Sequence, residues 1–345
     1  MKTPKISVVM PIYNVEAFVR DAVQSVLDQS FTDFELICVD DGGTDTSMDI
    51  VREFSDERIR IVCQANRGLA GARNSGIAHA RGDFIALLDS DDVWHRDKLQ
   101  LHFIHLTANP HIGVSYAGSR MIDREGKVLS VAMRPKLGQV TPRDIICRNP
   151  VGNGSAPVLR RSALEKAAFM HPAVVGRKCW FDEDFRQSED IELWTRLSVK
   201  HGVRFAGIAG LLTDYRIIPG ALSANVVKQY LSWTKMLRKL RSYAPEFVEE
   251  HGDTARAYQL RYLARRSLQL GNFELARDFL RKAIGLRPRI IAEEPRKTAV
   301  TAAAIVTASL LGKDRFVAVM RPCETKDNIT EIYRLTLWQL DCTTN

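Results

Sequence analysis

The stretch Phe84-Ile-Ala-Leu-Leu-Asp89-Ser-Asp91-Asp92 sets the fold. Its first five residues are apolar, which predicts a strand buried on both faces. Three carboxylates follow within four residues, and because a core does not accept unpaired carboxylates, the chain must leave it at Asp89. Close carboxylates repel one another unless a proton or a cation relieves them. Hard ions such as Mn²⁺ or Mg²⁺ prefer oxygen ligands, so the stretch predicts a metal site; a solvated acidic turn is the alternative.

Apolar runs that alternate with amphipathic helices surround this stretch. Strands are expected at four further places, with helices between them: residues 6–12, 34–39, 59–63 and 113–117. Short connections and strict alternation predict a Rossmann-like, mostly parallel sheet with helices on both faces. Asn14 is predicted to cap the first helix.

Polar residues follow three of these strands directly. Tyr13 and Asn14 end the first strand, Asp40 and Asp41 end the second, and Asp89 ends the central one. In a parallel sheet the carboxyl ends of the strands form the ligand-binding edge. The sequence therefore predicts that these side chains form one functional acidic site.

A second acidic pair lies further along the chain, at Glu189 and Asp190. Ser188 is predicted to cap a helix that begins there, and the helix dipole favours carboxylates in a first turn, which is the purely structural explanation of the pair. Before it, Val151-Gly-Asn-Gly-Ser155 is expected to form a flexible loop. Residues 203–206 and 211–216 are expected to form two strands.

The chain has 345 residues, 26% of them charged and 45% hydrophobic, as in an ordinary globular protein. No apolar stretch reaches the length of a membrane span, and Met1-Lys-Thr-Pro4 leads directly into a strand, so no signal peptide is expected. Six cysteines without metal-ligand spacing predict reduced thiols and a cytoplasmic protein.

The positive charge is concentrated in one part of the chain. Residues 225–345 hold 21 Lys and Arg against 13 Asp and Glu, so they carry the whole net charge of +8, and residues 1–224 are neutral. This division predicts a catalytic domain over 1–224 and a basic helical region over 225–345, and it argues against nucleic acid as partner of the first part. The basic helices fit a peripheral membrane contact, a protein partner or a solvated face.

Five blocks of sequence resemble the inverting family 2 glycosyltransferases of GT-A fold. They occur in the order and at the spacings of that family: Ser7-Val-Val-Met-Pro-Ile-Tyr-Asn14, Val39-Asp-Asp-Gly-Gly-Thr-Asp45, Asn66-Arg-Gly-Leu-Ala-Gly-Ala-Arg-Asn74, Leu88-Asp-Ser-Asp-Asp92 and Ser188-Glu-Asp-Ile-Glu-Leu-Trp194. The resemblance covers residues 5 to about 223. It implies a hexosyltransferase-type enzyme that uses a UDP-sugar donor and a glycan or lipid-linked glycan acceptor, at the inner face of the cell membrane.

The resemblance also implies roles for individual residues. Binding of the donor nucleotide is expected from the strand ends and the following helix, namely from Pro11, Ile12, Tyr13, Asp40, Asp41, Ala70, Arg73, Asp89 and Ser90. Within this set, Asp41 would accept a hydrogen bond from the uracil N–H, with Asp40 supporting it. Asp91, together with Asp89, would hold the metal at the diphosphate. Asp190 would be the general base, with Glu189 as its neighbour.

Two departures from the family pattern bear on these roles. Ile218 stands where many members carry a histidine, and the Gln-x-x-Arg-Trp motif of processive synthases is reduced to Gln229-Tyr-Leu-Ser-Trp233. The second departure predicts the addition of single sugars.

Two other classes of protein remain as alternatives. A sugar nucleotidyltransferase would need a Gly-rich basic loop after the first strand, and Pro11-Ile-Tyr-Asn-Val-Glu16 is not one. A non-catalytic nucleotide-binding scaffold with a helical interaction tail is opposed by the presence of Asp89, Asp91 and Asp190.

Overall fold

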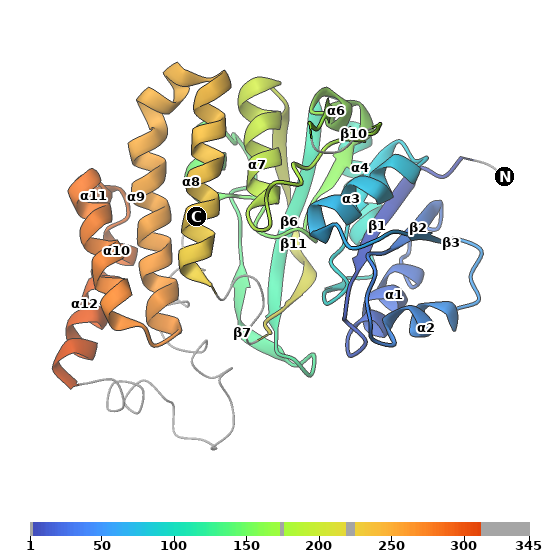
Figure 1. The fold of residues 1–345 in the computed structure, drawn as a ribbon, viewed down its shortest axis with the longest axis horizontal. Helices are drawn as coiled ribbons and strands as arrows, with labels where there is room; N and C mark the ends of the chain where they lie inside the picture. Colours follow the sequence, from blue (N-terminus) through green and yellow to red (C-terminus); the bar gives the residue numbers. More distant parts are fainter. Residues whose placement is uncertain (1–2, 173–175, 219–224, 312–345) are drawn as a thin grey trace.

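The computed structural model describes residues 3–172, 176–218 and 225–311 (Figure 1). Within these residues the chain forms a nine-stranded sheet in the order β3-β2-β1-β4-β8-β6-β11-β5, with β7 paired to β6, and a separate two-stranded sheet of β9 and β10. The strands are β1 (Ile6–Ile12), β2 (Phe34–Asp40), β3 (Ile59–Cys63), β4 (Phe84–Leu87), β5 (Val93–Trp94), β6 (Ile112–Ile122), β7 (Val128–Met133), β8 (Val158–Arg160), β9 (Phe169–Met170), β10 (Lys178–Cys179) and β11 (Arg204–Arg216).

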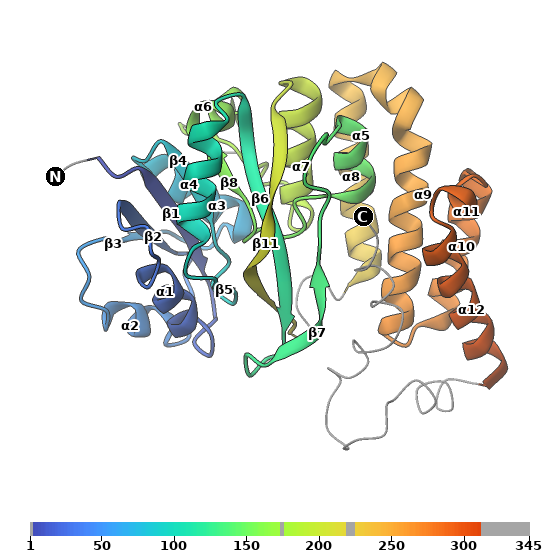
Figure 2. The same cartoon turned by 180° about the vertical axis from the view of Figure 1, so that it is seen from behind.

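Helices lie on both faces of the sheet and at one end of it (Figures 1 and 2). They are α1 (Val19–Leu27), α2 (Ser47–Arg52), α3 (Gly68–His79), α4 (Lys98–Ala108), α5 (Pro142–Arg148), α6 (Arg161–Lys166), α7 (Glu189–Thr195), α8 (Val226–Tyr243), α9 (Pro245–Gln269), α10 (Phe273–Leu286), α11 (Ile290–Glu293) and α12 (Pro295–Leu311). The predicted α/β class, a mostly parallel sheet followed by a helical region, is confirmed.

The first half of the sheet has the predicted parallel arrangement. β1 pairs in parallel with β2 and with β4, and β2 pairs in parallel with β3. Alternate residues of these strands pack in two separate cores: Val9, Ile37 and Leu87 on one face, and Val8, Leu36 and Leu88 on the other. Burial on both faces explains why these strands are continuous apolar runs.

The second half departs from simple alternation. β8 lies antiparallel between β4 and β6, so the predicted strand at residues 113–117, which is longer here as β6, does not pair with β4. The element before β8 is the helix α5, and the loop over residues 149–157 between them brings β8 into the sheet in the opposite direction. The two strands expected at residues 203–206 and 211–216 are one bulged strand, β11, parallel to β6 (Figure 2).

Two predicted helix caps are wrong. Asn14 has a positive φ of 51°, and its side chain accepts a hydrogen bond from the Thr44 backbone N–H instead of capping α1, which begins at Val19. Ser188 does precede α7, but it is left-handed and its side chain makes no capping hydrogen bond. In both places the residue lies in a tight turn. Asparagine and serine are common in tight turns as well as at helix caps, so the sequence alone did not separate the two.

The first C-terminal helix packs on the main core. Trp233, Met236 and Leu240 of α8 belong to the same buried cluster as the sheet residues, whereas α10 and α12 contribute to a separate cluster with α9. The division at residue 224 stays a prediction. Over the described ranges, none of the helices has both the length and the apolar character needed to cross a bilayer.

Candidate active site

The carboxyl ends of β1, β2 and β4 meet at one edge of the sheet, as their parallel pairing requires. Pro11 and Ile12 are buried at the end of β1, and Tyr13 beyond them is 49% exposed. An apolar floor with an exposed aromatic ring next to it can stack a planar base. These three predicted residues therefore lie together beside the acidic side chains.

Asp41 orders the loop that leads into α3. Its carboxylate accepts hydrogen bonds from Gln64 Nε2 (2.6 Å) and from the backbone N–H groups of Arg67 (2.8 Å) and Gly68 (2.9 Å). An ionised carboxylate has about four acceptor positions, so three bonds leave one on Oδ2. Asp40 is half-buried and accepts from the Gly42 N–H. Ala70, in the first turn of α3, is buried.

The Asp89–Asp92 turn is held from behind by two residues that the sequence did not single out. Ser155 Oγ accepts from the Asp89 N–H (2.9 Å) and donates to Asp92 Oδ2 (2.5 Å). Arg216 donates its backbone N–H to Asp92 Oδ1 and its Nε to the Asp91 carbonyl. These bonds fix the backbone of the predicted metal ligands. These bonds join residues that are 63 and 124 positions apart, so no local sequence pattern could have predicted them.

Arg73 brings the two acidic motifs together. It is 1% exposed, and its guanidinium donates to Asp89 Oδ1 (2.6 Å) and to Glu189 Oε1 (2.8 Å). Residues that are 100 positions apart in sequence thus share one buried cation. Although burial opposes its charge, Asp89 and Glu189 raise the pKa of Arg73 above its usual value.

Burial and mutual repulsion keep several of these carboxyls easier to protonate than usual. Burial, with the negative charge of Asp89, raises the pKa of Asp91 to about 6. Burial likewise raises the pKa of Glu189 to about 7, against the opposing effect of Arg73, and it raises the pKa of Asp190. Raised pKa values in a group of neighbouring carboxyls are typical of catalytic sites.

The predicted loop at Val151–Ser155 is more ordered than a flexible loop. Asn153, Gly154 and Ser155 are buried, and Asn153 donates to Ser119 Oγ. Ser90, between the two predicted metal ligands, is also buried. The loop thus forms a back wall behind Asp89.

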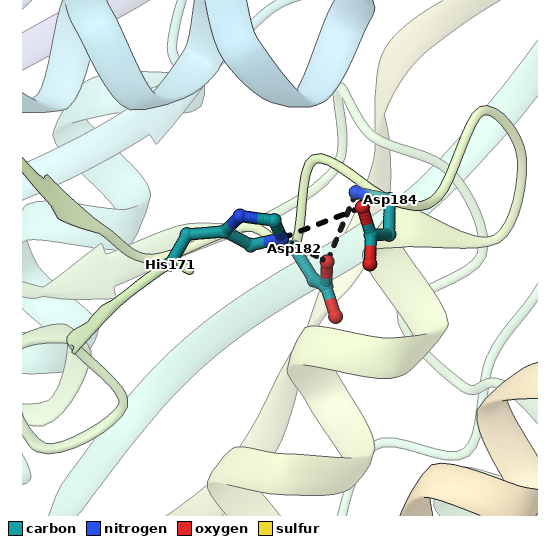
Figure 3. A group of neighbouring side chains, drawn as sticks. All are labelled: His171, Asp182 and Asp184. Atoms are coloured by element: carbon teal, nitrogen blue, oxygen red, sulfur yellow. Dashed lines mark hydrogen bonds and ion pairs between the residues drawn. The ribbon is translucent and has the colours of Figure 1, made fainter. Parts of the chain in front are cut away.

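A second group of possible metal ligands lies away from Asp89 and Asp91. His171 Nε2 is 3.2 Å from Asp182 Oδ1 and 3.5 Å from Asp184 Oδ1 (Figure 3). One possible ligand atom from each of the three side chains lies within 4.8 Å of the others, and no other such group of three occurs among the described residues. Lys239 Nζ lies 2.6 Å from Asp182 Oδ2, so this group already contains a cation.

The fold is that of GT-A glycosyltransferases, and solved structures of that kind align with most of the chain. Staphylococcus aureus TarS superposes with a TM-score of 0.56 at 17% identity, over 94% of this chain and 56% of TarS. The mannosyltransferase PcManGT from Pyrobaculum calidifontis, solved with GDP-Man and Mn²⁺, gives 0.56 at 18% identity over 99% of this chain and 87% of its own. Part of TarS, solved with UDP-GlcNAc, superposes with a TM-score of 0.52.

The chain belongs to glycosyl transferase family 2, whose family model matches residues 7–167. It is 31% identical over 227 residues to the putative teichuronic acid biosynthesis glycosyltransferase TuaG of Bacillus subtilis, covering 64% of this chain and 82% of TuaG. It is 28% identical to the UDP-Glc:alpha-D-GlcNAc-diphosphoundecaprenol beta-1,3-glucosyltransferase WfgD of Escherichia coli, covering 74% of this chain and 90% of WfgD. The resemblance to the family 2 glycosyltransferases that the five blocks indicated is thus confirmed, and the chain is a glycosyltransferase.

Proposed function

We propose that this enzyme transfers a single sugar from a UDP-sugar to an acceptor hydroxyl, with inversion and with the help of Mn²⁺ or Mg²⁺. The observation that carries the proposal is the contact of Arg73 with both Asp89 and Glu189. It supports one site in which the donor side and the base side of a displacement reaction face each other.

The donor nucleotide is proposed to lie against the ends of β1 and β2. Pro11, Ile12 and Tyr13 would form the wall for uracil, and the acceptor position left on Asp41 Oδ2 would receive its N–H. The name of the WfgD relative specifies UDP-Glc, and a part of TarS was solved with UDP-GlcNAc, which supports a UDP-sugar donor.

The metal is assigned to Asp91 and Asp89. A pKa of about 6 for Asp91 reflects burial and repulsion from Asp89, and a divalent cation would stabilise both ionised carboxylates. The donor set therefore fits a hard ion with oxygen ligands. When bound, such an ion neutralises the negative charge that develops on a leaving diphosphate.

Asp190 is proposed as the general base that accepts the proton of the attacking hydroxyl. A single displacement from the opposite face of the sugar inverts the anomeric configuration and needs one base. Glu189 beside it forms an ion pair with Arg73, whereas the Asp190 carboxylate accepts a hydrogen bond from the backbone N–H of Ile191. This difference supports Asp190 over Glu189 for accepting the proton.

The acceptor is proposed to be a glycan or a lipid-linked glycan, in line with the names of TuaG and WfgD. The basic region 225–345 would then contact the inner face of the membrane, or a protein partner, at the site of synthesis.

The experiment is a screen of UDP-sugars for hydrolysis and for transfer to extracted lipid-linked glycans, with Mn²⁺ and with EDTA. Turnover of one UDP-sugar that stops in EDTA, with a product of inverted configuration by NMR, is expected. Turnover of GDP- or dTDP-sugars alone would contradict the donor assignment, and binding without any turnover would favour the non-catalytic scaffold.

A further inference from the structure

Three segments of the fold meet at one arginine. Arg73 comes from α3, Asp89 follows β4, and Glu189 begins α7. The guanidinium is also 5.3 Å from the ring centroid of Phe181, which covers one of its faces. A guanidinium with two fixed carboxylate partners and a packed face has one orientation available. Its position therefore sets the separation of Asp89 and Glu189.

Gly154 closes the remaining side of this arrangement. A Cβ added at Gly154 would overlap Arg73 Nη2 and would lie 2.7 Å from Asp89 Oδ2. Real Cβ atoms do not approach other atoms this closely, so any other residue at position 154 would force the Arg73 guanidinium or the Asp89 carboxylate to shift. The next residue, Ser155, holds the Asp89 N–H, and thus the same loop positions both members of the ion pair.

Stability does not explain the arrangement well. Arg73 faces three carboxylates, those of Asp89, Glu189 and Asp190. A buried cation with surplus negative charge is a weak source of stability, because desolvation offsets much of the attraction. Fixed geometry between reacting groups, in contrast, has a large effect on rate, since a displacement of about 1 Å can cost about 10²-fold.

We propose that Arg73 is a positioning residue for sugar transfer, and that Gly154 holds it in place. This inference rests on the function proposed above, in which Asp89 lies on the donor side and Glu189 adjoins the base. Arg73 acts through these two carboxylates and need not touch the sugar nucleotide. Its loss should therefore lower kcat more than it raises the KM for the donor.

Two variants and their combination test this inference on the full chain, with a UDP-sugar that the wild type turns over. Arg73→Lys keeps the charge but reaches only one carboxylate, and kcat should fall by about 10²-fold while the donor KM stays close to that of the wild type. Gly154→Ala keeps every charge and should lower kcat by displacing Arg73. Arg73→Lys removes the contact of the new Cβ with the guanidinium and leaves only its contact with Asp89 Oδ2, so the losses in the double variant should be less than additive.

Each variant has a matched control. Gly138 has nothing within 4 Å of an added Cβ, so Gly138→Ala should leave kcat unchanged. Arg196 is a second buried arginine with two bonds to one glutamate, Glu192, at 2.9 and 3.0 Å. Arg196→Lys should lower thermal stability but not kcat.

Several outcomes would overturn the inference. These are an unchanged kcat in Gly154→Ala, a loss confined to the donor KM in Arg73→Lys, and additive losses in the double variant. Unfolding of both single variants would assign Arg73 to stability instead. A wild type that turns over no sugar nucleotide would contradict the proposed function itself, which separates the two failures.

Discussion

Two clusters of buried and half-buried carboxylates lie close to α7, and they differ in their balance of charge. In the Arg73 cluster, one arginine faces Asp89, Glu189 and Asp190. In the Lys239 cluster, Lys239 lies 2.6 Å from Asp182 and 2.7 Å from Glu192, and Arg196 also pairs with Glu192. The first has three acids for one base, and the second has two of each.

The carboxyl pKa values follow this balance. Burial raises the pKa of Glu189 to about 7, because Arg73 offsets only part of it and Asp190 adds repulsion. Burial acts on Asp182 as well, but the hydrogen bond and charge of Lys239 keep its pKa below the usual value. What distinguishes a site that fits a cation from a structural network is therefore its excess of negative charge, and not the number of its carboxylates.

The largest expected effect is on the cluster with excess charge. Asp91→Asn should abolish metal-dependent binding of UDP while the far-ultraviolet circular dichroism stays unchanged, because the metal loses a ligand. Calorimetry with UDP and Mn²⁺ measures this. Asp184→Asn, in the group beside Lys239, is the matched control and should bind UDP as the wild type does. If Asp91→Asn bound UDP in Mn²⁺ with the affinity of the wild type, the assignment of the metal to Asp91 would be wrong.

Removal of the base should separate binding from chemistry. Asp190→Asn should keep its UDP affinity and lose about 10²–10⁴-fold in transfer rate, the usual contribution of a general base. Single-turnover transfer measured beside UDP titration distinguishes the two properties. A rate close to that of the wild type would instead assign the proton to Glu189.

Breaking the balanced cluster should affect stability and leave the chemistry intact. Lys239→Met leaves Asp182 and Glu192 with less compensation and should lower the free energy of unfolding by roughly 3 kcal/mol, as when one partner of a buried ion pair is lost. Chemical denaturation measures the loss. A fall in UDP affinity without a fall in stability would show that the clusters are not separate in function.

The buried side chain of Lys98 extends the comparison to pH, because within the described ranges it forms no ion pair, and Asp92 only partly offsets the effect of its burial. Lys98 donates to the Ala156 carbonyl and to Thr213 Oγ1, and burial lowers its pKa from 10.5 to about 7. Between these values the unfolded chain binds the proton and the folded chain does not, so Lys98 makes stability rise with pH by up to about 1.4 kcal/mol per unit. The free energy of unfolding of Lys98→Met should therefore rise less between pH 7.5 and 9 than that of the wild type. Stability curves of the two proteins that run parallel with pH would contradict a buried neutral lysine.

The sequence predicted those parts of the fold and site that depend on local pattern. Continuous apolar runs identified β1, β2 and β4, and parallel pairing then placed Asp41 and Asp89 at one edge. The antiparallel entry of β8 and the supporting bonds of Ser155 and Arg216 were not predicted, because they depend on which distant segments meet. The same limit applies to Gly154, whose need for a missing Cβ comes from Arg73 and not from its own backbone.

Calorimetric titration of the full chain with UDP, first with Mn²⁺ and then with EDTA, tests the central claim most directly. Binding that requires Mn²⁺ is the predicted result, because Asp89 and Asp91 would share the ion with the diphosphate. UDP affinity that is the same in EDTA would contradict the metal site. Absence of UDP binding in both conditions would contradict the donor site as a whole.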